Sequence, residues 1–234
     1  MAFKRNLTAF ALFTLLSTGF AYAENCAQKN TFSGLIFDAG AFPSPQNMEN
    51  HLDKALSYGV EKVVLFPHAS AQPGNKPDEL EEIFPDLVVQ GEAPWNDGEA
   101  IVWAEEIVKS GLDALGAELE ANPMQAFLLP NPLRYDLKTV LNMQKQYENL
   151  WIGFGVDEIE ALLKTCAKGD VARLMDVSDG KVVFASYGQF QGWKSYKWTI
   201  RKLKKLASVL PKQKADAFIF GNAEELYNLA VNAP

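Results

Sequence analysis

The sequence predicts an α/β fold, a single (β/α)8 TIM-like barrel built on parallel strands. Eight short apolar segments punctuate the chain, and most are followed by an amphipathic helical pattern, an alternation typical of βα units. These segments are rich in Val, Ile, Leu and Phe, as expected of strands buried on both faces of a sheet. The chain beyond residue 23 is long enough to bury the core of one small barrel.

The expected strands and helices follow in order, with ordinary start and stop signals between them. Pro45 opens the first helix and Gly59 ends it, and Asp97 and Gly111 bound the second in the same way. The strands are expected at 34–40, 61–69, 86–93, 114–120, 126–132, 150–156, 181–188 and 215–222. The helices are expected at 46–59, 97–111, 136–147, 157–169, 196–210 and 223–232.

One interval does not fit this scheme. Between Glu120 and Ala126 there is room only for a turn, whereas two parallel neighbouring strands need a crossover of roughly a dozen residues. Either the barrel lacks the helix between strands four and five, or one of these two segments is not a parallel strand.

The first 23 residues resemble a secretory signal peptide. Lys4 and Arg5 precede an apolar run, and Ala21-Tyr22-Ala23 fits the small-x-small pattern at a cleavage site. The run is too short for a bilayer span and the chain then turns polar. We therefore expect a signal peptide over 1–23, a single domain over 24–234, a periplasmic or secreted location and no membrane anchor.

Cys26 and Cys166 are the two cysteines of the chain. In an oxidising compartment they are candidates for one disulfide, which would tie the mature N-terminus to a late helix. The alternative is two unpaired thiols, with Cys166 packed on its helix.

The charge balance argues against nucleic acid as a partner. The net charge is -7, whereas binding to the phosphates of nucleic acid needs a basic face. The run RKLKKL is interpreted as the solvated side of a helix whose Ile200, Leu203 and Leu206 face the sheet.

Several motifs, in order along the chain, are similar to those of a known family. They are IFDAGAF at the first strand, ALSYGVEKVVLFP at the second, YENLWIGF, KVVFASYGQ and IFGNAEELYNL near the end. In this order they resemble the amidohydrolase-related family of metal-dependent hydrolases, whose first strand typically ends in Asp-x-His-x-His. The resemblance implies a (β/α)8 barrel with a metal site at the carboxyl ends of its strands.

The chain departs from that family at the positions of the metal ligands. Gly40 and Phe42 stand where the two histidines of the first motif would be, and Tyr187 stands at the position of the catalytic aspartate. The mature chain has only His51 and His68. Because zinc or a similar cation needs several converging ligands, we expect no family-type metal and no cofactor.

Other side chains could rebuild a site at the carboxyl ends of the strands, where barrels keep their chemistry. Clustered carboxylates would serve as acid and base, or would bind a divalent cation such as Ca²⁺ or Mg²⁺. The alternative is that they face solvent or bond loop backbone. The catalytic candidates are Asp38, His68, Glu92 and Tyr187, and the substrate-binding candidates are Phe42, Trp95, Glu120, Asn131, Asp157, Ser186 and Asn222.

Three functions follow from this pattern. The first is an exported amidohydrolase-like barrel that has lost its metal site and acts as a small-molecule-binding or accessory protein, a pseudoenzyme. The second is a hydrolase or lyase acting on a small molecule through a rebuilt carboxylate, His and Tyr site. The third is a protein-interaction module, for which the sequence selects no partner.

Overall fold

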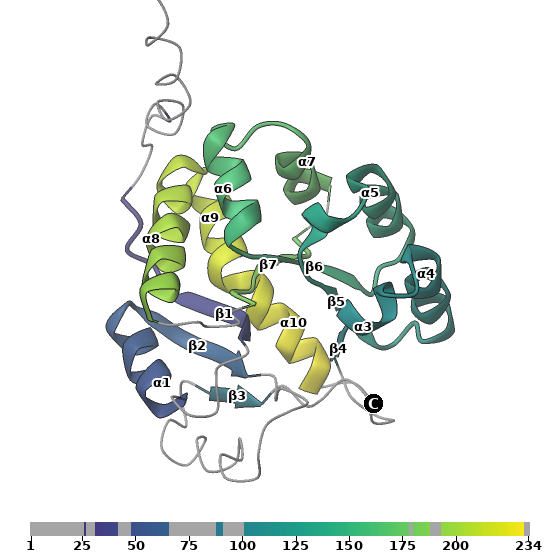
Figure 1. Ribbon diagram of the computed structural model, residues 1–234, viewed down its shortest axis with the longest axis horizontal. Coiled ribbons are helices and arrows are strands. Elements are labelled where there is room, and N and C mark those ends of the chain that lie inside the picture. The colour runs from purple at the N-terminus through teal and green to yellow at the C-terminus, as the bar shows by residue number, and fades with distance from the viewer. Residues whose placement is uncertain are drawn as a thin grey trace, which may run out of the picture.

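Seven parallel strands in two sheets form the centre of the described part of the chain (Figure 1). The computed structural model describes residues 26, 31–41, 48–65, 88–90, 101–177, 180–187 and 193–231. The expected signal peptide at 1–23 lies outside them. One sheet has the order β1-β2-β3 and the other β4-β5-β6-β7, and every pair of neighbours is parallel.

The strands are short and nearly all of their described side chains are buried, which explains their apolar composition. Their bounds are β1 Ile36–Ala41, β2 Val60–Leu65, β3 Val88–Gln90, β4 Ile101–Trp103, β5 Ala126–Leu129, β6 Leu150–Phe154 and β7 Val182–Phe184. Six of these lie within or overlap expected strands, the exception being β4.

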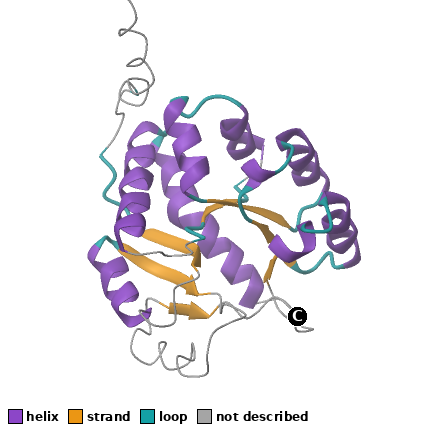
Figure 2. Cartoon of the chain, in the orientation of Figure 1, coloured by secondary structure: helices purple, strands orange, loops and turns teal. Residues whose placement is uncertain are grey.

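Helices connect the strands and cover them (Figure 2). The α-helices are α1 Met48–Ser57, α3 Glu105–Val108, α4 Leu112–Ala121, α5 Leu137–Gln146, α6 Val156–Lys164, α7 Asp170–Val177, α8 Trp193–Val209, α9 Lys212–Asp216 and α10 Asn222–Val231. A 3-10 turn, η2, spans Pro132–Arg134, and a π-helical turn, η3, spans Ala217–Gly221. None of the described helices has the length and apolarity needed to cross a membrane.

The predicted fourth strand is wrong, because residues 114–120 belong to helix α4. That stretch consists of Ala, Leu, Gly and Glu, and apart from its glycine it holds good helix formers. The true fourth strand, Ile101–Trp103, lies inside the helix expected at 97–111, and its β-branched and aromatic residues suit a strand. Helices α3 and α4 therefore supply the crossover from β4 to β5, so the helix expected to be missing is present.

The predicted eighth strand at 215–222 is also wrong, because this stretch is helical from α9 through η3 into α10. Its buried residues recur at helical spacing, with Ala215, then Phe218 and Ile219, then Asn222 and Ala223. A short apolar run does not distinguish a strand from a buried helix, and here the longer periodicity decides.

The two sheets do not form a closed barrel in the described residues. The end of β7 does reach β1, since the backbone N–H of Tyr187 donates to the carbonyl oxygen of Gly40 at 3.0 Å. The helical turn η3 packs against both β1 and β7. The structure thus confirms an α/β fold with parallel sheets, whereas the eight-stranded barrel stays a prediction.

The core has two parts that follow the alternation of side chains along the strands. One lies between the strands and the covering helices, and it includes Ile200, Leu203 and Leu206 of α8, as predicted. The other joins both sheets to α10, which Figure 1 shows crossing between them. In it Phe37 of β1 stacks on Tyr227 of α10, with ring centroids 5.6 Å apart.

Candidate functional site

The carboxyl ends of four strands come together in what we call the strand-end cluster. Side chains and backbone from β1, β4, β6 and the segment after β7 contact one another there. The members of the cluster are Asp38, Gly40, Trp103, Gly153, Gly155, Ser186 and Tyr187.

Asp38 is fully buried and its carboxylate is enclosed by hydrogen-bond donors. Its Oδ1 accepts from the backbone N–H of Ser186 at 2.8 Å and of Gly40 at 3.3 Å. Its Oδ2 accepts from the hydroxyl of Tyr196, on α8, at 3.3 Å. The pairing of β1 with β2 is irregular between Asp38 and Ala41.

Burial raises the pKa of Asp38 to about 6, although hydrogen bonds from the backbone N–H groups of Ser186 and Gly40 and from the Tyr196 hydroxyl hold it down. The Ser186 hydroxyl itself completes no hydrogen bond within the described residues. A carboxyl that titrates near pH 6 is suited to proton transfer. This one, however, is shielded from solvent and directed at the protein's own donors.

Tyr187 lies over the end of β6. Its backbone has φ 49°, a left-handed conformation that is uncommon for a bulky residue. Its hydroxyl donates a hydrogen bond to the carbonyl oxygen of Gly153, and its ring meets that of Trp103 edge to face with centroids 5.7 Å apart. Burial raises the pKa of Tyr187 well above 10, so the phenol stays neutral and keeps this bond.

The aromatic rings require glycine at the strand ends. A Cβ on Gly155 would lie 2.4 Å from the Tyr187 ring, and one on Gly40 would lie 2.7 Å from the Trp103 ring. Real Cβ atoms essentially never approach so closely. At Gly40, where the motif resemblance led us to look for a histidine, the indole of Trp103 occupies the space that a side chain would take.

Two further predicted residues lie near the cluster. Asn131 lies two residues after the end of β5 in a left-handed conformation, φ 48°. Its backbone partly offsets the rise that burial causes in the pKa of Tyr187. Asp157 follows β6 on the first turn of α6, but its side chain is exposed.

Glu158, the next residue, is the buried carboxylate that sequence reasoning missed. It accepts from the backbone N–H of Gly155 at 3.0 Å and of Leu133 at 3.4 Å, and burial raises its pKa. A glutamate three residues after the N-cap residue, here Gly155, is a capping signal that the sequence itself carries.

The remaining predicted site residues are not brought to the cluster. Glu120 is exposed on α4, since the strand expected there is a helix. Asn222 is buried at the opposite end of β7, where its amide donates to the carbonyl oxygen of Val182 at 2.7 Å. Four candidates lie outside the described residues, namely Phe42, His68, Glu92 and Trp95.

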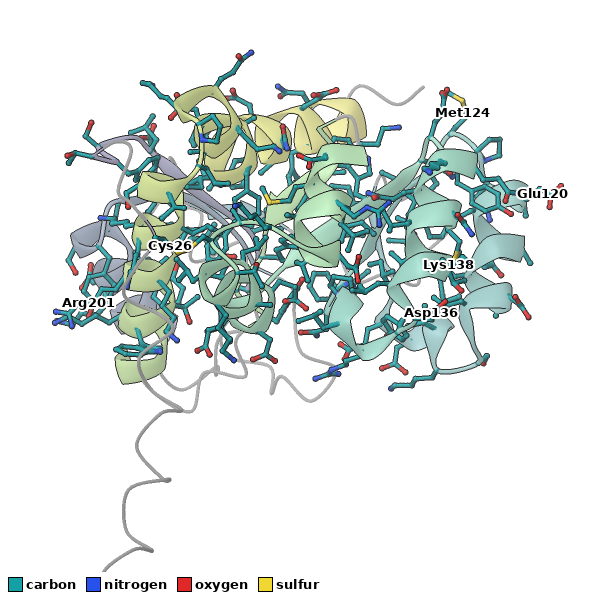
Figure 3. All side chains as sticks on the ribbon, turned by 90° about the horizontal axis from the view of Figure 1, so that it is seen from above. Cys26, Glu120, Met124, Asp136, Lys138 and Arg201 are labelled. Atoms are coloured by element: carbon teal, nitrogen blue, oxygen red, sulfur yellow. A yellow bond between two sulfur atoms is a disulfide. The ribbon has the colours of Figure 1, made fainter. Side chains whose placement is uncertain are left out.

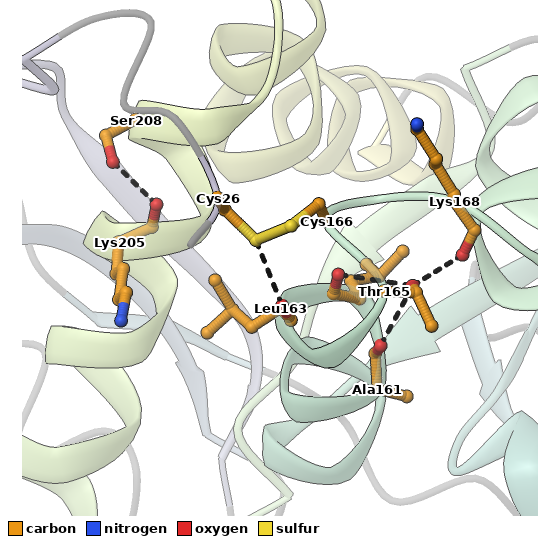
Figure 4. Close-up of a disulfide and its surroundings, with 9 residues drawn as sticks. Cys26, Ala161, Leu163, Thr165, Cys166, Lys168, Lys205 and Ser208 are labelled. Carbon is orange, nitrogen blue, oxygen red and sulfur yellow. Dashed lines mark hydrogen bonds between the residues drawn. A yellow bond between two sulfur atoms is a disulfide. The ribbon is translucent and has the colours of Figure 1, made fainter. Parts of the chain in front are cut away.

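Cys26 and Cys166, the candidate pair, form a disulfide across a sequence separation of 140 residues (Figure 4). It ties the segment before β1 to the turn that ends α6. Cys26 Sγ lies 3.2 Å from the carbonyl oxygen of Leu163, a close contact only, because an oxidised sulfur carries no hydrogen to donate.

The described residues do not fit the metal site that the family resemblance implies. Within them, no group of three or more His, Cys, Asp or Glu side chains could hold an ion. Both oxygens of Asp38 already accept from Ser186, Gly40 and Tyr196. A metal ion at Asp38 would have to compete with these three donors for the carboxylate oxygens.

Substituting Gly155 with alanine tests this packing. We expect Gly155→Ala to lower the free energy of unfolding by roughly 1–3 kcal/mol, because the new methyl group forces the Tyr187 ring to move. Urea unfolding measures the effect. In a Tyr187→Ala background most of the cost should vanish, and an equal cost in both backgrounds would contradict the assignment. Gly116→Ala on α4 is the control, since its Cβ meets only Tyr147 Oη at 3.5 Å.

Together these features define an α/β protein with parallel sheets whose strand ends are packed with aromatic rings. No protein-family model matches the chain, and no curated protein matches it. A crystal structure described as an amidohydrolase II is similar to it, with a TM-score of 0.43 and 14% sequence identity over 85% of this chain and 93% of that chain. The function proposed below rests on the geometry of the strand-end cluster.

Proposed function

We propose that this protein is an exported, amidohydrolase-like binding or accessory protein that has lost the metal site of such hydrolases. The observation that carries the proposal is the filling of the strand ends. Trp103 takes the space above Gly40, and Tyr187 takes the space above Gly153 and Gly155. A hydrolytic centre needs a substrate within hydrogen-bond reach of its acid or base, and this packing leaves Asp38 no exposed surface.

Asp38 is then a structural residue that joins three elements. Through its three hydrogen bonds it connects β1 to the segment after β7 and to α8. The proposed ligand is a small molecule bound at the outer edge of the cluster, where the side chains of Asn131 and Tyr187 are partly accessible and that of Asp157 is exposed. The Cys26–Cys166 disulfide supports export, because disulfides persist in oxidising compartments.

A second candidate is a hydrolase or lyase with a rebuilt, metal-free site. The pKa of Asp38, raised by burial to about 6, favours it, since a general base works best near the operating pH. Its substrate would have to displace Tyr187, whose ring covers β6 and whose N–H is bonded to Gly40. The first proposal, a binding or accessory protein, requires no movement of Tyr187 and is therefore preferred.

Metal content tests the proposed function. After dialysis we expect no stoichiometric zinc, manganese or iron by inductively coupled plasma mass spectrometry. Added Zn²⁺, Mn²⁺, Ca²⁺ or Mg²⁺ should change the melting temperature of the wild type and of Asp38→Asn by the same amount. Asp157→Asn is the matched control, because it removes an exposed carboxylate from the same edge. One retained equivalent of metal that Asp38→Asn loses and Asp157→Asn keeps would overturn the proposal.

A further inference from the structure

A groove of about 310 Å³ lies between α6 and α8, away from the strand-end cluster. We call it the α6–α8 groove. It is lined by Glu160, Leu163 and Lys164 of α6 and by Trp198, Arg201, Lys202 and Lys205 of α8. Its volume is within the range of pockets that take small molecules, and is too small to seat a folded partner.

The groove carries a local excess of positive charge on an otherwise acidic chain. Helix α8 contains no Asp or Glu, whereas the whole protein has a net charge of -7. The carboxylate of Glu160 is taken up by an ion pair with Lys202, and these side chains are only 33% and 19% exposed. Lys164 and Arg201 form no ion pair with the described residues, so their charge is available to an anion.

The groove also presents an aromatic surface. Trp198 is 55% exposed, which is unusual for the largest apolar side chain. The ammonium of Lys202 lies 4.7 Å from the centroid of its ring, so the Glu160 ion pair and this cation–π contact together hold the indole at the groove. Leu163 and the alkyl stems of the lysines extend the apolar lining.

We propose that the α6–α8 groove binds a compact amphipathic anion, a carboxylate attached to an aromatic or aliphatic body. The body would pack on Trp198 and Leu163, and the carboxylate would pair with Arg201 and Lys164. Arginine suits this role because its planar guanidinium binds a carboxylate through two parallel hydrogen bonds. This site goes beyond the proposed function and does not depend on whether Asp38 is catalytic.

Titration calorimetry with 2-naphthoate at low ionic strength tests the site. We expect saturable one-to-one binding, with 2-naphthamide, the neutral analogue, and inorganic phosphate both weaker by about fivefold or more. Trp198→Ala and Arg201→Gln should each weaken naphthoate about fivefold, and Arg201→Gln should also remove the preference for naphthoate over naphthamide. Lys138→Gln is the matched control, since it removes one exposed cation at the opposite end of the molecule from Arg201 (Figure 3).

Three results would overturn the proposal. If the wild type, Trp198→Ala and Arg201→Gln bind naphthoate with equal affinity, the ligand binds outside the α6–α8 groove. Phosphate binding as tightly as naphthoate would leave no role for the aromatic lining. The third result has two parts. The wild type would bind no naphthoate, and it would co-sediment with phosphatidylglycerol vesicles but not with phosphatidylcholine vesicles, an association lost in Arg201→Gln. This face would then be a membrane-binding surface instead.

Discussion

Replacing Cys26 and Cys166 together with serine should lower the free energy of unfolding more than any other change considered for this protein. The disulfide closes a loop with a sequence separation of 140 residues, so it removes much conformational entropy from the unfolded chain. Chain-entropy arithmetic gives about 5 kcal/mol for such a loop, and native disulfides typically contribute about 2–5 kcal/mol. In a domain of this size the melting temperature should fall by roughly 10 °C.

Differential scanning calorimetry measures this loss, and reductant provides the control. Wild-type protein should lose the same increment when it is reduced, whereas the double serine variant should not respond to reductant. A melting temperature unchanged by either treatment would contradict a stabilising disulfide. A fall in the serine variant that reduction of the wild type does not reproduce would point instead to packing of the new side chains beside Leu163.

Replacing Asp38 with alanine is expected to have the second largest effect. The substitution leaves the N–H groups of Ser186 and Gly40 and the hydroxyl of Tyr196 without their acceptor in a buried site. Each unsatisfied buried group costs about 1–3 kcal/mol, so at pH 5 the free energy of unfolding should fall by roughly 3 kcal/mol or more. Asp38→Asn keeps the shape and one acceptor oxygen, and should cost much less.

The same carboxyl makes stability depend on pH in a defined direction. Burial raises the pKa of Asp38 from 3.8 to about 6, so between these values the folded protein binds more protons at this site than the unfolded chain. The stability contribution of the group is therefore fully present below pH 3.8 and is lost as the pH rises through about 6. The loss amounts to roughly 3 kcal/mol.

Urea unfolding of wild type and Asp38→Asn between pH 4 and pH 8 isolates this contribution, because the other carboxyls cancel in the difference. The wild type should lose roughly 3 kcal/mol relative to Asp38→Asn as the pH rises. A difference that does not change with pH would show that the carboxyl is not buried, and a difference of the opposite sign would show that its pKa is lowered. Asp157→Asn, an exposed neighbour, should track the wild type throughout.

The sequence predicted most of the strands because each is a local feature. Stretches such as 36–41 and 150–154 combine β-branched or aromatic residues with flanking glycines, and such patterns need no distant partner to be recognised. The two wrong strands are short apolar runs whose helical period shows only over a longer window. In 215–227 the buried positions repeat at helical spacing, and the contacts with α10 decide between strand and helix.

For the site, the sequence identified the special residues but not their surroundings. Asp38, Ser186 and Tyr187 were singled out, and the structure brings all three to the strand-end cluster. Trp103, Tyr196 and Glu158 were missed as members or neighbours of this group. Trp103 lay in a stretch expected to be a helix, and Tyr196 reaches Asp38 across a separation of 158 residues.

The sequence by itself determined the class of the fold, the order of most of its elements, the candidate pairing of Cys26 with Cys166 and the absence of histidine from residues 38–42. Only the tertiary structure decided that the Trp103 indole occupies the space above this glycine and that Asp38 is sealed by Ser186 and Tyr196. The physical reason is that periodicity and composition report on neighbours along the chain. The burial of a carboxylate and its pKa depend on groups that folding brings together from distant parts of the sequence.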